Sequence, residues 1–74
     1  MSRLIRMDHS GHTTVAEWNA ADSASVERAR AAFETELGQG YMAVVSRGEG
    51  HAEQVRELPP DAPTVILRRP IAGG

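Results

Sequence analysis

The sequence contains no cysteine and no lysine. Without cysteine the chain has no disulfide, no thiolate ligand for zinc and no thiol nucleophile, so its fold has to rest on packing alone. This composition suits a reducing compartment, and we expect a cytoplasmic protein. All eight basic residues are arginine, which leaves the N-terminal amine as the only aliphatic amine of the chain.

Long apolar runs are also absent. No stretch approaches the roughly 20 residues of a membrane span, and residues 1–6 are too short for the apolar part of a signal peptide. The eight arginines are spread among ten acidic residues, so no concentrated basic face favours nucleic acid. With 74 residues the chain forms one small domain with little room for a deep catalytic cleft. We therefore expect no enzyme, no nucleic-acid partner and no membrane partner.

One helix is expected from apolar spacing. Val26, Ala29, Phe33 and Leu37 recur at intervals of three and four residues, which places them on one stripe of an α-helix. The helix is expected to begin at the capping oxygens of Asp22 and Ser23, with Glu27 near its positive end, and to stop at Gly38 and Gly40. Charged residues off the stripe and in later strands are expected to face solvent: Arg28, Arg30, Glu34, Glu36, Glu53 and Glu57.

Strands are expected from apolar runs and from period-2 alternation. The candidate segments are 3–7, 13–18, 41–45, 53–58 and 64–69. Turns are expected at 8–11, where Gly11 can adopt positive φ, and at 47–50, and three prolines at 59–63 favour an extended crossing. The sequence thus predicts an α+β domain over 1–69 followed by a flexible tail, 70–74. Its aromatic residues are expected in or beside the core: Trp18, Phe33 and Tyr41.

Polar residues offer few candidates for chemistry. Asp8, His9 and His12 lie close together in a turn, but they lack the further spaced ligands of a metal site. Ser10 beside His9 is not a catalytic triad, because triad members must converge in space with an oxyanion site. His51 is expected in a loop. We therefore assign no catalytic residue, no metal and no cofactor.

The end of the sequence is its most distinctive feature. An apolar run, Val65-Ile66-Leu67, leads into Arg68-Arg69-Pro70-Ile71-Ala72 and a final Gly73-Gly74. This ending and the order of elements over 1–74 resemble those of ubiquitin-like β-grasp proteins, and the chain looks like a short bacterial member of that family. The resemblance implies a mixed sheet of four to five strands, with one helix packed across it and the last strand slotted centrally beside the first.

The resemblance also implies a function for the tail. A partner adenylating enzyme would activate the carboxylate of Gly74 for conjugation to an amine of a target protein, with conjugating and deconjugating enzymes as further partners. Glycine at Gly73 and Gly74 allows passage through a crowded channel, because neither has a Cβ atom. The expected contacts with the partner are those of Arg68, Arg69, Pro70 and Ile71.

Two alternatives remain open. Sulfur carriers of thiamine and molybdopterin synthesis share the fold and the terminal glycine pair, and in such a protein Gly74 would become a thiocarboxylate. The chain could also be a small binding module in which the terminal glycines are incidental. Ubiquitin differs in having lysines for chain building and no equivalent of Pro70. Its aliphatic recognition patch cannot be placed residue by residue, although Val44, Val45, Ile66 and Leu67 are expected to divide between core and surface.

Overall fold

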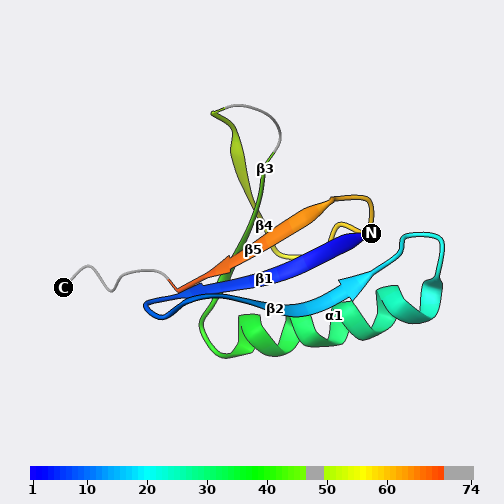
Figure 1. The fold of residues 1–74 in the computed structure, drawn as a ribbon, viewed down its shortest axis with the longest axis horizontal. Helices are drawn as coiled ribbons and strands as arrows, with labels where there is room; N and C mark the ends of the chain where they lie inside the picture. Colours follow the sequence, from blue (N-terminus) through cyan, green and yellow to red (C-terminus); the bar gives the residue numbers. More distant parts are fainter. Residues whose placement is uncertain (47–49, 70–74) are drawn as a thin grey trace.

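The computed structural model describes residues 1–46 and 50–69. In this part of the chain one helix lies across one face of a single five-stranded sheet (Figure 1). The elements are β1 (Ser2–Asp8), β2 (Gly11–Trp18), α1 (Ser23–Gly38), β3 (Met42–Ser46), β4 (Ala52–Val55) and β5 (Thr64–Arg68). The expected α+β architecture is confirmed.

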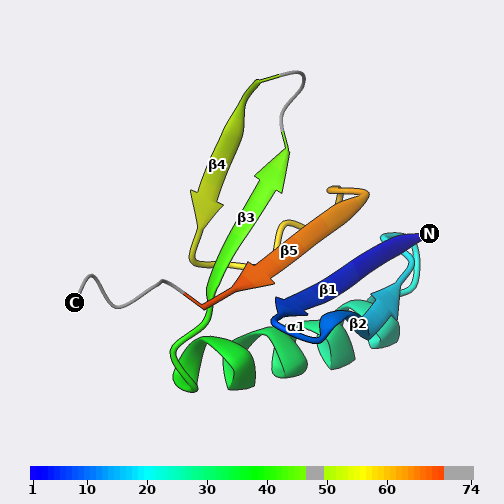
Figure 2. The ribbon, with the colours of Figure 1, turned by 60° about the vertical axis from the view of Figure 1, so that its left-hand side comes forward.

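The strand order is β2-β1-β5-β3-β4, so the last strand occupies the centre of the sheet (Figure 2). β5 runs parallel to β1 and antiparallel to β3, and the two outer pairs are antiparallel hairpins. Val65 stands opposite Leu4 on one side and Val45 on the other. This is the β-grasp arrangement expected from the sequence, with the first and last strands side by side.

Local sequence explains where α1 begins. Asp22 is in the extended region, and its carboxylate Oδ1 accepts hydrogen bonds from the backbone amides of Ala24 at 3.1 Å and Ser25 at 3.4 Å. Ser23, expected to share the cap, is instead the first helical residue. Glu27 is expected near the positive end of the helix, but it lies after the first turn, which contains no acidic residue, so this expectation is also wrong.

The end of α1 is a Schellman motif. The amide of Gly40 donates to the carbonyl of Leu37 at 3.1 Å, and the amide of Tyr41 donates to the carbonyl of Glu36 at 3.2 Å. Gly40 carries the positive φ of 96° that this motif requires, whereas Gly38 is still helical. The stop therefore lies at the second of the two expected glycines.

The core fills the space between α1 and the sheet. Phe33 and Trp18 are fully buried, as expected, and Tyr41 lies half-buried at the edge. Val45 and Leu67 turn inward while Val44 and Ile66 lie on the opposite face, which confirms their expected division. The buried cluster consists of Leu4, Trp18, Val26, Ala29, Phe33, Ala43, Val45, Leu58, Ala62, Val65 and Leu67.

The fourth strand differs from expectation. β4 begins at Ala52 and ends at Val55, whereas the sequence predicts a strand over 53–58. Leu58 lies instead in the loop that crosses back to the start of β5, and its side chain is buried. The indole Nε1 of Trp18 donates to the carbonyl of Pro60 at 2.9 Å, and this bond fixes the proline-rich crossing against the core.

A register shift interrupts the first hairpin. Leu4 pairs with Ala16 and Ile5 pairs with Thr14, so Val15 is left without a partner as a bulge. The bulge breaks strict alternation in β2, which is why the sequence does not reveal the inward face of that strand. Among the described residues, no helix is long and apolar enough to cross a membrane.

Candidate interaction surface at the end of β5

The sheet face opposite α1 carries a group of apolar side chains that we call the outer-face patch. Leu4, Val65 and Leu67 are buried towards α1, so their neighbours in β1 and β5 point the other way. Ile66 lies in register between Ile5 and Val44. The outer-face patch consists of Ile5, Met7, Met42, Val44 and Ile66, of which Met7 is 45% exposed.

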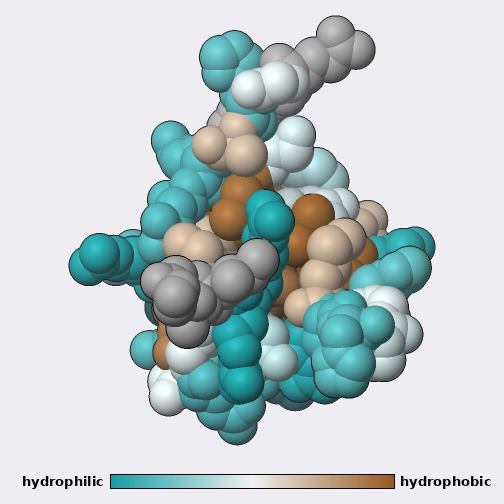
Figure 3. Space-filling model, turned by 90° about the vertical axis from the view of Figure 1, so that its left-hand side faces the viewer, coloured by the Kyte–Doolittle hydropathy of each residue, from teal (hydrophilic) through white to brown (hydrophobic). Residues whose placement is uncertain are grey.

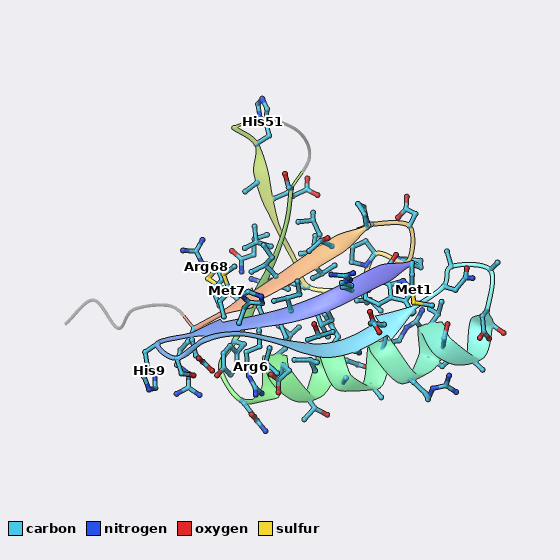
Figure 4. The ribbon with its side chains drawn as sticks, viewed as in Figure 1. Met1, Arg6, Met7, His9, His51 and Arg68 are labelled. Carbon is cyan, nitrogen blue, oxygen red and sulfur yellow. The ribbon has the colours of Figure 1, made fainter. Side chains whose placement is uncertain are left out.

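Arg68 extends the outer-face patch at the last position of β5. It stands in register between Met7 of β1 and Met42 of β3. Figure 4 shows the side chains of Arg68 and Met7 on the same side of the sheet, whereas Arg6 lies on the side of α1. His12 is paired with Met7 in β2 and is exposed beside the outer-face patch. An apolar surface bordered by an arginine is suited to a partner that carries acidic side chains.

Arg69 has different surroundings. Its guanidinium carbon lies 5.0 Å from the centre of the Tyr41 ring, and its Nη2 donates to the carbonyl of Gln39 at 3.4 Å. The guanidinium carbon of Arg6 lies 6.0 Å from the same ring. The sequence treats Arg68 and Arg69 as one basic pair, but the structure brings only Arg69 to the end of α1.

Arg6 and Glu36 form an ion pair on the α1 side of the sheet, contrary to the expectation that Glu36 faces solvent. Glu36, expected on the solvent face, is 5% exposed, and its Oε1 accepts a hydrogen bond from Nη1 of Arg6 at 2.9 Å. This hydrogen bond, followed by the charge of Glu36, raises the pKa of Arg6. The signal was present in the sequence, because Glu36 is three positions after Phe33 and seven after Ala29, on the inward stripe.

An open groove lies where β5 ends, beside Tyr41, Arg68 and Arg69. Its lining combines the first hairpin, the end of β5 and the segment that follows α1: Met7, Asp8, His9, Tyr41, Arg68 and Arg69. Figure 3 looks onto this end of the molecule and shows apolar side chains exposed among hydrophilic ones. Met7 of the groove and Met42 of the outer-face patch are not among the site residues expected from the sequence, although strand alternation places both opposite the core.

Asp8, which lines the groove at the first hairpin turn, accepts two hydrogen bonds from Ser10. The amide and hydroxyl of Ser10 donate to Oδ1 of Asp8 at 2.9 and 2.6 Å, and these bonds lower the pKa of Asp8. Within 1–46 and 50–69, no three histidine or carboxylate side chains converge on a possible metal position. The expected tail residues Pro70, Ile71, Gly73 and Gly74 lie outside the described residues.

A second cavity, beside α1, is a weaker candidate. Its volume is about 210 Å³, below the roughly 300 Å³ at which small-molecule sites usually begin. Two arginines and two glutamates dominate its lining, which comprises Arg30, Glu34, Arg56, Glu57 and Leu58. Nη1 of Arg30 also lies 3.9 Å from Oε1 of Glu27. This mixture of opposite charges favours no particular ligand.

The candidate site is thus defined by its own geometry, as a basic and apolar surface around the end of the central strand. Comparisons with protein-family models, curated proteins and solved structures find no match to this chain.

Proposed function

We propose that this chain is a ubiquitin-like protein modifier, activated at the carboxylate of Gly74 and conjugated to amines of target proteins. The observation that carries the proposal is the position of β5. This strand is held on both sides by β1 and β3 and ends beside the outer-face patch, and the sequence after it closes with Gly73-Gly74. A rigid strand followed by a terminus without side chains suits delivery of a carboxylate into a partner's active site.

The proposed chemistry needs two steps. The Gly74 carboxylate attacks the α-phosphorus of ATP, and pyrophosphate leaves as the acyl adenylate forms. A nucleophile of the partner or an amine of the target then attacks the acyl carbon and releases AMP. If extended, the five residues 70–74 would reach about 16–18 Å past Arg69, which is enough to separate the reacting carboxylate from the folded domain.

The outer-face patch and Arg68 support the choice of partner. Activation requires the enzyme to hold the domain while the carboxylate reacts, so a docking surface beside the tail is useful. The patch supplies apolar area, and Arg68 supplies a guanidinium that can form two parallel hydrogen bonds with a carboxylate. We propose that an adenylating enzyme docks here through apolar and acidic side chains.

ATP–pyrophosphate exchange with an adenylating enzyme of the same organism tests this function. The intact chain should support exchange, whereas a variant lacking Gly74, or carrying Gly73→Val, should not. Glu34→Gln is the matched control, because Glu34 is exposed on α1 and belongs neither to the outer-face patch nor to the groove at the end of β5. Equal exchange by the truncated variant would exclude chemistry at the terminal carboxylate.

Intact mass then separates the modifier from the sulfur carrier. Chain isolated from its own host should appear in covalent conjugates, with the loss of water that amide formation requires. A free chain about 16 Da heavier than the sequence mass would instead show that sulfur has replaced one carboxylate oxygen. That result would contradict the modifier and establish the carrier.

A further inference from the structure

Two adjacent arginines at the end of β5 have opposite environments. Arg68 lies on the outer face in register with Met7 and Met42, whereas Arg69 contacts the Tyr41 ring and the carbonyl of Gln39. Arg68 is the last residue of β5, and strand alternation places it on the outer face, whereas Arg69 follows the strand and is placed on the side of α1 by its contacts. The two guanidinium groups therefore cannot perform the same task.

We propose that Tyr41 and Arg69 form an anchor that fixes the end of β5 to the end of α1, while Arg68 is the arginine that binds the partner. The anchor rests on the contacts of Arg69 alone. The role of Arg68 rests in addition on the proposed function.

The charge of the helix end explains why Arg69 is held there. The last carbonyls of α1 carry partial negative charge, and no basic residue lies in its last turn. Arg69, the residue after β5, brings a positive charge to this end, and its Nη2 reaches the carbonyl of Gln39. One side chain thus serves both the helix terminus and the aromatic ring.

The position of Tyr41 is fixed independently of Arg69. Its amide closes the Schellman motif by donating to the carbonyl of Glu36. The Glu36 carboxylate binds Arg6, whose guanidinium lies near the same ring at 6.0 Å. The ring therefore offers Arg69 a preformed surface, and a guanidinium 5.0 Å from its centre is within the usual range for cation–π attraction.

The anchor has a consequence for the proposed reaction. A strand end that is already fixed loses less conformational freedom when the following residues enter a partner's channel. The anchor also leaves Arg68 on the outer face beside the apolar patch. Tyr41 and Arg69 are thus positioning residues, and Arg68 is a residue that determines partner binding.

A double-mutant cycle tests the anchor without any partner enzyme. Tyr41→Leu, Arg69→Gln and the double variant are unfolded in urea, with the buried Trp18 as the fluorescent probe. We expect a coupling of about two- to fivefold in the unfolding equilibrium constant, the range of an exposed cation–π contact. The matched cycle with Arg68→Gln in place of Arg69→Gln should show no coupling to Tyr41.

A spectroscopic measurement keeps the test valid if a variant is poorly folded. The Arg69 Nε–H proton should be shifted upfield by the Tyr41 ring, and Tyr41→Phe, which keeps the ring, should preserve both this shift and wild-type stability. Absence of the shift in the wild-type chain, or equal coupling of both arginines to Tyr41, would overturn the anchor.

Exchange kinetics test the division of roles. Arg68→Gln should raise KM with little change in kcat, as expected for lost binding. Arg69→Gln and Tyr41→Leu should impair exchange equally, and the double variant no further. If Arg68→Gln leaves KM unchanged, the partner role of Arg68 is wrong. If the wild-type chain shows no exchange but the unfolding cycle shows coupling, the proposed function fails while the anchor stands.

Discussion

Arg6 of β1 and Glu36 of α1 form an ion pair in which Nη1 and Oε1 are 2.9 Å apart. The two partners are unequally buried: the Glu36 side chain is 7% exposed, whereas the Arg6 side chain is 32% exposed. Within the described part of the chain, Nε of Arg6 is buried and has no hydrogen-bond partner. Because Glu36 is the more buried partner, its carboxylate depends on the positive charge of Arg6 for compensation.

Removing only Arg6 should lower the stability of the fold more than removing both Arg6 and Glu36. Arg6→Leu leaves a buried carboxylate without its cation, so the Tm followed by circular dichroism should fall clearly. The double variant Arg6→Leu/Glu36→Leu removes both charges and should recover much of the loss. Arg3→Leu is the control, since Arg3 pairs with Glu17 in an exposed position. A double variant less stable than Arg6→Leu would contradict this account.

Two glycines near the end of α1 should respond oppositely to alanine. Gly40→Ala forces a side chain into φ of 96° and should cost about 1–2 kcal/mol in the free energy of unfolding. Gly38→Ala lies in helical backbone with nothing within 4 Å of the added Cβ, and should stabilise by about 0.5–1 kcal/mol. Urea unfolding of both variants measures the difference, and equal effects would rule out the Schellman assignment.

Asp8 should make stability depend on pH in the acidic range. Hydrogen bonds from Ser10 lower its folded-state pKa below the ordinary value of 3.8. Its contribution is present above that value and is lost as pH falls through the lowered pKa. The stability difference between wild type and Asp8→Asn should therefore decline below about pH 3.8. Carbon-detected NMR titration should show the Asp8 pKa rising in Ser10→Ala, which keeps the backbone amide, and an unchanged pKa would exclude the Ser10 hydroxyl as a cause.

The absence of lysine predicts single-copy conjugates if the chain is a modifier. Arginine keeps its proton and offers no nucleophilic amine, so only the N-terminal amine could accept another copy. Mass spectrometry of conjugates formed by the native enzymes, with and without N-terminal acetylation, measures the number of copies at each target amine. A ladder that persists after acetylation would require ester or other linkages.

Much of the fold was predictable because it depends on short-range patterns. The stripe from Val26 to Phe33 predicts α1, and the apolar run from Val65 to Leu67 predicts a strand that is buried on its inner side. The central position of β5 came from the family resemblance, since alternation alone does not give strand order. The position of Leu58 was missed because a buried loop residue leaves no periodic signal.

The candidate site was harder to predict because it depends on contacts across the chain. Nothing near Arg69 in the sequence indicates that Tyr41 and Gln39 receive its guanidinium. The pairing of Arg6 with Glu36 likewise joins residues 30 positions apart. The outer-face patch was accessible in principle from alternation within β1, β3 and β5, but only after their register had been established.

The adjacency of β1 and β5 has a consequence for how the molecule folds. Arg3 and Thr64 pair although they lie near opposite ends of the described chain, so the central ladder forms only when the largest loop has closed. Such nonlocal pairing slows folding relative to that of helical domains of similar size. The same ladder should open only with the whole domain, which would make the amides shared by β1 and β5 the slowest to exchange with solvent.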